Sequence, residues 1–171
     1  MFIIEFSLAI VGILILLVFI ITFGIPAVKG AQFAVTTPSK VIKIIAVIEK
    51  YKKGKITDLG SGDGRIVIAA ARAGFEAHGY EINPFLVWLS RRKIKRAGLE
   101  KKAFIHRQDL WRVNLSGYDI ITLFGVGHRM KKFETKLRTE LKPGAIVISN
   151  YFQFPSWPST ALDDNIYLYR Q

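Results

Sequence analysis

"DLGSGDGR", residues 58–65, is the stretch that decides the fold of this chain. It places three glycines between a strand-like apolar run and an alanine-rich run of helical period. The same alternation continues along the chain, with strand-like runs expected at 55–60, 76–82, 103–109, 118–125 and 145–150. Strands that alternate with helices indicate βαβ units. We therefore predict an α/β fold with a doubly wound, mostly parallel, Rossmann-like sheet, and 165–170 as a candidate last strand.

The glycine-rich turn follows the first strand, where doubly wound sheets bind their ligands. Its glycines have G-x-G-x-G spacing, and Arg65 stands where the dinucleotide fingerprint needs a third glycine. The P-loop pattern is also absent. Asp58 and Asp63 flank the turn, and carboxylates there would repel a pyrophosphate. The turn favours a positively charged, phosphate-free ligand such as S-adenosylmethionine, which bare glycines allow to approach the backbone closely.

Polar side chains also end the next two strands. Glu81 lies about 20 residues after the turn, where an acid accepts hydrogen bonds from both hydroxyls of a ribose. Gln108 and Asp109 end the third strand, in position to accept from an adenine amino group. Taken singly, a glycine turn is often only a tight connection and an acid at a strand end a solvated cap. Three such features at successive strand ends predict an adenosine-sized pocket.

Five longer blocks carry a resemblance to a known family: residues 58–91, "RQDLW" at 107–111, "YDIITLFGV" at 118–126, "LKPGAIVIS" at 141–149 and "FQFPSWP" at 152–158. They resemble the class I methyltransferases, and especially the membrane-anchored protein-lysine methyltransferases of mitochondria that modify the ATP synthase c subunit and the adenine nucleotide translocator. The resemblance implies lysine N-methylation with S-adenosylmethionine as donor. The residues that it implies for cofactor binding are Thr37, Asp58, Gly60, Ser61, Gly62, Asp63, Arg65, Glu81, Ile82, Asn83, Gln108, Asp109 and Leu110.

The acceptor side of the site is expected beyond the fourth and fifth strands. A lysine must react as the neutral amine, and a desolvated aromatic channel lowers its pKa. Six residues are candidates for that channel: Phe124, Gly125, Val126, Asn150, Tyr151 and Trp157. The Asn/Asp-Pro-Pro-aromatic motif common in amino-group methyltransferases is missing there, and ordinary packing of a terminal segment is the alternative for each aromatic residue. Thr37 precedes a helix whose N-terminus can face the methionine carboxylate, although an N-cap threonine needs no ligand.

The N-terminus carries a long apolar segment. From Phe6 to Val28 there is no charged residue, enough for a helix to exceed the ~30 Å hydrocarbon thickness of a bilayer. A cleavable signal peptide is the competing interpretation, but the segment is long and an acid precedes it. We predict a transmembrane anchor at 1–28, a linker and helix at 29–54, and the methyltransferase domain at 55–171. Lysines that follow the span place the domain on the cytoplasmic side, or the matrix side in a mitochondrion. The absence of an Arg- and Ser-rich transit sequence favours a prokaryotic relative.

The formal charge of +12 predicts an anionic partner. The densest basic run is 91–96, and lipid head groups are favoured over nucleic acid because the anchor holds the domain near a bilayer. The chain has no cysteine and no spacing typical of metal ligands, so we expect no metal site. The expected acceptor is a lysine of a protein that itself lies in the membrane. A nucleic acid or small-amine methyltransferase, or a non-catalytic membrane adaptor with the same fold, remain the alternatives.

Overall fold

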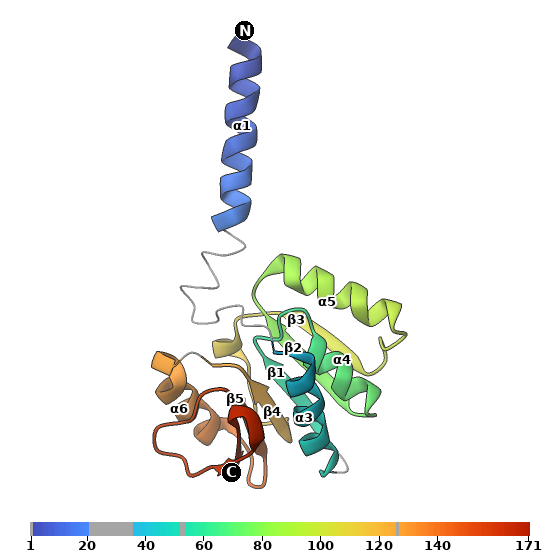
Figure 1. Ribbon diagram of the computed structural model, residues 1–171, viewed down its shortest axis with the longest axis vertical. Helices are drawn as coiled ribbons and strands as arrows, with labels where there is room; N and C mark the ends of the chain where they lie inside the picture. Colours follow the sequence, from blue (N-terminus) through green and yellow to red (C-terminus); the bar gives the residue numbers. More distant parts are fainter. Residues whose placement is uncertain (1, 21–35, 52–53, 126) are drawn as a thin grey trace.

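The computed structural model describes residues 2–20, 36–51, 54–125 and 127–171. Its core is one seven-stranded sheet with the strand order β3-β2-β1-β4-β5-β7-β6 (Figure 1). The strands are β1 (Lys55–Leu59), β2 (Glu76–Glu81), β3 (Ala103–Arg107), β4 (Ile120–Leu123), β5 (Ile146–Asn150), β6 (Thr160–Ala161) and β7 (Ile166–Arg170). Strands β1 to β5 pair in parallel, and β7 is antiparallel to both of its neighbours. The predicted doubly wound, mostly parallel sheet is confirmed.

Helices cover both faces of the sheet. They are α3 (Pro38–Glu49), α4 (Arg65–Arg72), α5 (Pro84–Arg96) and α6 (Met130–Glu140), with 3₁₀ helices η2 (Leu110–Arg112), η3 (Gly127–Arg129) and η4 (Asp163–Asn165). Because side chains alternate along a strand, Ile56 and Ile120 pack toward α3 and α4, whereas Leu59 and Leu123 pack toward α6. Each fully buried Ile or Leu contributes about 1.5–3 kcal/mol.

Helix α3 begins at the cap that the sequence predicts. The Thr37 hydroxyl accepts a hydrogen bond from the Lys40 amide, and Pro38 occupies the first helical position. One face of α3 is apolar at helical spacing, and its Ile44 and Ile48 are buried in the same core as α4. Helix α3 therefore packs as part of the α/β domain, and its N-terminus lies close to the end of β5.

The N-terminal helix α1 (Phe2–Phe19) lies outside the α/β domain in Figure 1. Its described apolar side chains are exposed, among them Phe6, Leu8 and Ile15. In the part of the chain that the structure describes, no helix has both the length and the apolar character needed to cross a membrane. The predicted span runs to Val28, and its residues 21–28 lie outside the described residues.

Candidate active site

The glycine-rich turn joins β1 to α4 by a backbone that only glycine adopts freely. Gly60, Gly62 and Gly64 have φ angles of 80°, 54° and 78°. All three lie in the left-handed region, where a side chain is strained. The Gly60 and Ser61 amides donate to the Tyr80 carbonyl at 2.9 and 3.1 Å, which folds the turn back over the end of β2. The three glycines therefore serve a tight turn whose outer surface is bare backbone.

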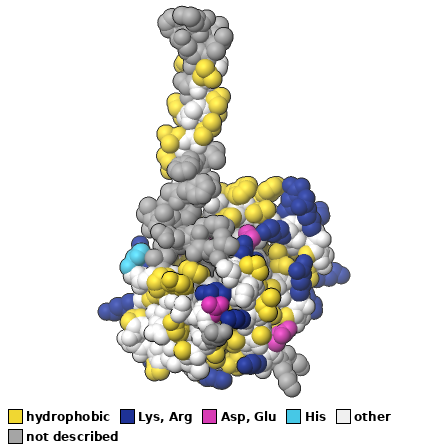
Figure 2. Space-filling model, in the orientation of Figure 1, with side chains coloured by type: hydrophobic (Ala, Val, Ile, Leu, Met, Phe, Trp, Pro, Cys, Tyr) yellow, Lys and Arg dark blue, Asp and Glu magenta, His cyan; other side chains and the backbone are white. Residues whose placement is uncertain are grey.

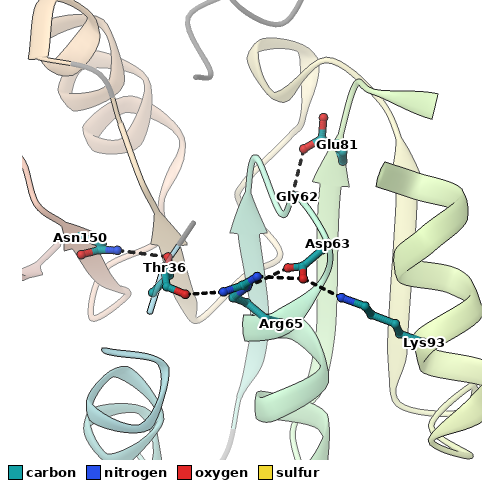
Figure 3. A network of polar contacts seen from close by, with 7 residues as sticks. All are labelled: Thr36, Gly62, Asp63, Arg65, Glu81, Lys93 and Asn150. Atoms are coloured by element: carbon teal, nitrogen blue, oxygen red, sulfur yellow. Dashed lines mark hydrogen bonds and ion pairs between the residues drawn. The ribbon is translucent and has the colours of Figure 1, made fainter. Parts of the chain in front are cut away.

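Glu81, at the end of β2, holds this turn in place. Its carboxylate accepts a hydrogen bond from the Gly62 amide at 3.0 Å (Figure 3). It also accepts one from the Asn83 amide at 2.8 Å. Glu81 is buried, and the Asn83 side chain caps α5 by accepting from the Phe85 amide. Each carboxylate oxygen can accept a second hydrogen bond. The group can therefore fix the turn and still accept from the two hydroxyls of a ribose, the role predicted for it.

Asp58 is a buried carboxyl group next to the turn. The Thr122 hydroxyl of β4 donates to it at 2.7 Å. The pKa of Asp58 is raised to about 7, chiefly by burial. The nearby carboxylates of Glu81 and Asp63 contribute to this rise, and the hydrogen bond from Thr122 opposes it. No cation of the described residues is paired with Asp58. A positively charged ligand would supply that missing charge, so the site fits the sulfonium and ammonium groups of S-adenosylmethionine.

Asp63 has a different environment from the one that its position in the turn suggests. Its carboxylate binds Arg65 at 2.8 Å and Lys93 of α5 at 2.6 Å (Figure 3). Burial alone would raise the pKa of Asp63, but the hydrogen bonds from Arg65 and Lys93 outweigh it and lower the pKa to about 2. Both cations neutralise this carboxylate. The charge that favours a cationic ligand therefore comes from Asp58 and Glu81, and not from Asp63 as the sequence suggested.

Thr36 links the glycine-rich turn to the end of β5, a role that the sequence analysis assigned to no residue. Its carbonyl accepts from the Arg65 guanidinium at 2.5 Å, and its hydroxyl accepts from the Asn150 amide group at 3.2 Å (Figure 3). Thr36 is buried, whereas the predicted Thr37 is exposed and caps α3. Arg65, predicted to contact the cofactor, thus ties the N-terminus of α3 to α4. Two adjacent threonines before a proline were the only signal for this bridge.

The predicted adenine side lies beyond β3. The Gln108 amide donates to the Glu81 carbonyl at 3.1 Å, and the Asp109 carboxylate caps η2 by accepting from the Trp111 amide at 3.1 Å. Leu110 is buried and Ile82 half-buried. These groups follow the carboxyl ends of β2 and β3, as the sequence predicts.

Ser61 is the least satisfied polar group of the turn. It is buried and packs against Gly79, and its hydroxyl has no hydrogen-bond partner among the described residues. A buried hydroxyl without a partner is costly. The Ser61 hydroxyl could therefore form a hydrogen bond with a polar group of a bound ligand.

The candidate acceptor side is an aromatic cluster at the ends of β4 and β5. The rings of Phe124 and Tyr151 are stacked with centroids 6.0 Å apart, and Phe152 meets Tyr151 edge-on at 5.0 Å. Tyr151 is half exposed and has φ of 81°, a strained conformation for a non-glycine residue. Such strain is frequent at functional sites. The buried Asn150 directly precedes this cluster.

Gly125 and Val126 are the other two predicted acceptor residues that follow β4. Gly125 lies against the Met130 side chain, whose sulfur would have to shift to admit a side chain at this position. Val126 lies outside the described residues. In the part of the chain described, no group of three or more His, Cys, Asp or Glu side chains could hold a metal.

The structure does not bring Trp157 to the acceptor cluster. Its ring packs against Phe154 and Tyr169, and its indole N–H donates to the Arg170 carbonyl at 3.2 Å. Arg170 pairs with Ile146, at the start of β5, whereas the acceptor cluster follows the end of that strand. Trp157 is therefore a core residue at the opposite edge of the sheet, because the chain after β5 turns back along the strand.

Comparison with known proteins agrees with this geometry. Residues 58–161, which contain the turn, Glu81 and the aromatic cluster, match the family model described as the ANTKMT methyltransferase domain. The chain belongs to this family. The resemblance stated from the sequence is confirmed.

Three relatives illustrate the range of the family. The lysine N-methyltransferase of the ATP synthase c subunit from Rattus norvegicus is 41% identical over 156 residues, covering 81% of this chain and 72% of that protein. The protein-lysine N-methyltransferase of Saccharolobus islandicus is 34% identical, covering 72% of this chain and 78% of that protein. The adenine nucleotide translocase lysine N-methyltransferase of Mus musculus is 44% identical, and the match covers 65% of this chain and 49% of that protein. The chain spans about half the length of several of the curated relatives that it matches, the translocase methyltransferase of Mus musculus among them.

A solved structure shares the fold closely. The RNA methyltransferase of Salinibacter ruber, crystallised with S-adenosyl-L-homocysteine, superposes with a TM-score of 0.71 at 30% identity. The match covers 80% of this chain and 92% of that one.

Proposed function

We propose that this chain is an S-adenosylmethionine-dependent protein-lysine N-methyltransferase. The observation that carries the proposal is the glycine turn that Glu81 closes, beside the buried and unneutralised carboxyl group of Asp58. The relatedness to lysine methyltransferases from an animal and an archaeon supports the choice of acceptor.

The residues divide the work between binding and orientation. When bound, S-adenosylmethionine supplies an activated methyl group to an in-line displacement. Asp58 balances its positive charge, and Glu81 holds its ribose against the turn. On the acceptor side, Phe124, Tyr151 and Phe152 exclude water from an incoming amine and Asn150 accepts one of its N–H groups. Holding the reacting atoms in line is the main contribution that such a site makes to the rate.

The acceptor is the point on which the alternatives differ. The fold neighbour named as an RNA methyltransferase favours nucleic acid as the second candidate. We expect labelled methyl groups from the donor to enter the membrane protein fraction and to be released by protease digestion and not by nuclease. Label that resists protease and is removed by nuclease would overturn the proposed lysine acceptor, and no transfer to either fraction would favour the non-catalytic adaptor.

We also propose that the enzyme works at a membrane, where its acceptor protein lies. The exposed apolar side chains of α1 support a role for the N-terminal segment as an anchor, because a helix that is apolar all round is normally buried in a protein core or a membrane. The lysines that follow the apolar segment support the cytoplasmic side for the domain, or the matrix side in a mitochondrion.

The outer face of α5 supports contact with anionic lipid head groups. Phe85 and Trp88 are 54% and 51% exposed, and Arg92 lies 5.3 Å from the Trp88 ring. Figure 2 shows apolar and basic side chains side by side on this part of the surface. A hollow of about 600 Å³ beside them is lined by Pro84, Val87, Trp88, Arg91, Arg92, Lys95 and Arg107. Tryptophan and basic residues together are typical of the membrane interface.

Two other basic residues of this helix have internal roles. Arg91 donates to the Ile105 carbonyl at 2.7 Å, and Lys93 binds Asp63. The head-group contact is therefore assigned to Arg92 and Lys95, together with the ring of Trp88.

Neutralising Arg92 and Lys95 should weaken binding of the full chain to vesicles that contain phosphatidylserine. Each basic residue near an anionic surface contributes about 1 kcal/mol, so Arg92→Gln with Lys95→Gln should lower the partition coefficient about 30-fold. Binding to neutral phosphatidylcholine vesicles should not change. Co-sedimentation measures both, and Lys131→Gln with Lys132→Gln on α6 is a control of equal charge. An equal loss in the control variant would show that only net charge matters.

A further inference from the structure

A lysine of the chain itself lies against the candidate acceptor cluster. The Lys40 ammonium group is 3.4 Å from the Asn150 side-chain oxygen and 5.4 Å from the centroid of the Tyr151 ring. A cation within about 6 Å of an aromatic face is held by the ring quadrupole. Lys40 thus donates to Asn150 and lies against one of the aromatic rings, the surroundings that the proposed function gives to a substrate amine.

The position of Lys40 is fixed by the fold. It lies in the first turn of α3, just after Pro38. The N-terminus of α3 is joined to the end of β5 by the hydrogen bond between Thr36 and Asn150, and to the cofactor turn by the bond between Thr36 and Arg65. The backbone that carries Lys40 is therefore anchored to both halves of the site, which keeps the amine beside the carboxyl edge of the sheet. Lys40 is only half-buried, so a proton leaving it can reach water.

We propose that Lys40 is a methyl acceptor of its own chain, so that the enzyme modifies itself. The proposal rests on the function proposed above. In the step, the lone pair of the neutral Lys40 amine forms the bond to the methyl carbon. The bond from that carbon to sulfur breaks, and its electron pair stays on sulfur, which becomes a thioether. The Lys40 ammonium group loses its proton to water before the attack, and the new N–C bond makes the nitrogen cationic again. Lys40 therefore ends with the positive charge it had as an ammonium group and loses one N–H donor with each methyl group.

Lys43 is a matched internal control on the same helix. Its ammonium group is 3.3 Å from the Asp164 carboxylate and so faces a carboxylate instead of an aromatic ring. General surface reactivity would modify the two lysines alike. Modification directed by the acceptor cluster would favour Lys40.

The test is mass spectrometry of the purified full chain before and after incubation with S-adenosylmethionine. We expect methyl groups on Lys40 and none on Lys43, and neither lysine should be modified in Asp58→Asn. The rate per molecule should not depend on protein concentration, because the acceptor belongs to the same chain. Lys40→Arg should remove the modification while Lys43→Arg leaves it unchanged.

A second measurement does not depend on turnover. Reductive methylation with ¹³C-formaldehyde labels every lysine, and the Lys40 signal should show a ring-current shift in the NMR spectrum that Tyr151→Leu removes. If Tyr151→Leu leaves the chemical shift of Lys40 unchanged, the Lys40 amine does not lie over the Tyr151 ring and the proposal is wrong.

Failure of this proposal can be told from failure of the proposed function. If the chain methylates membrane proteins and its Lys40 stays unmodified, self-modification is wrong and the lysine methyltransferase stands. If Lys43 is modified as much as Lys40, the acceptor cluster does not direct the reaction. If no protein is methylated, both proposals fail.

Discussion

Asp58→Asn should weaken cofactor binding strongly while making the folded protein more stable at pH 8. The buried carboxylate is the charge that faces a cationic ligand, and charge-assisted contacts contribute about 1.5–3 kcal/mol each. We expect the dissociation constant for S-adenosylmethionine to rise about 100-fold, which isothermal titration calorimetry measures. Thr122 can still donate to the oxygen of the new side chain, so the fold should be kept.

The stability gain follows from the raised pKa of Asp58, which is about 7 in the folded chain against a usual value of 3.8. Below about pH 4 the carboxyl group is protonated in both states and has no effect on stability. Between pH 4 and 7 the unfolded chain loses the proton first, so stability falls as the pH rises. Above pH 7 the full cost of roughly 4 kcal/mol is present. Asparagine removes this cost, but it buries an amide with new donors, which offsets part of the gain.

We therefore expect Asp58→Asn to raise the melting temperature by roughly 4–8 °C at pH 8, for a net gain of about 2 kcal/mol. The gain should be absent at pH 4. Asp164→Asn is the matched control, because Asp164 is an exposed aspartate whose positive φ asparagine tolerates. It should change neither the melting temperature nor the dissociation constant for S-adenosylmethionine. A variant that binds the cofactor as well as the natural chain does would contradict the role given to Asp58.

The affinity of the natural chain for the cofactor should increase between pH 6 and pH 8. A cationic ligand binds best when Asp58 is ionised, so affinity should be roughly tenfold weaker at pH 6 than at pH 8. Binding at pH 7 should release a fraction of a proton, seen as a dependence of the calorimetric heat on the buffer. Asp58→Asn should show neither effect.

Glu81→Gln should weaken cofactor binding about 100-fold or more. The carboxylate accepts two backbone N–H groups and is the predicted partner of the ribose. An amide presents one oxygen and one NH₂ group, so at least one backbone N–H group would face another donor. A buried donor without a partner costs about 1–3 kcal/mol, and we expect the melting temperature to fall by several degrees.

The ribose contact can be separated from the loss of turn structure. A cofactor analogue that lacks one ribose hydroxyl should bind the natural chain weakly and should lose nothing further in Glu81→Gln, since the two changes remove the same bond. Glu76→Gln is the control on the same strand, because Glu76 is exposed and bonds Lys55 and His78 at the surface. It should change stability by no more than about 0.5 kcal/mol. Equal and independent losses from the analogue and from Glu81→Gln would show that Glu81 only supports the turn.

Much of the fold and of the cofactor side could be read from the sequence because their causes are local. The spacing of Gly60, Gly62 and Gly64 sets a turn that needs positive φ, and the structure has it. Apolar runs in the sequence placed the five parallel strands to within one to two residues at each end. Glu81 was found because the end of a parallel strand after such a turn is where a ligand lies.

The partners of individual side chains could not be read in this way. Asp63 looked like a free acid of the turn, but Lys93, which is 30 residues further along the chain, neutralises it. Trp157 looked like a wall of the acceptor channel, but the return of the chain along β5 buries it at the other edge of the sheet. Thr36 and Asn150 are 114 residues apart and still share a hydrogen bond.

The order of the elements, the cofactor turn and the family of the enzyme could all be established from the residues in their linear order. Three features emerged only in the folded chain: which charges are neutralised, which aromatic rings form the acceptor cluster, and the position of Lys40 on that cluster. Backbone conformation depends mainly on neighbouring residues, whereas the environment of a side chain is set by distant segments that only folding brings into contact.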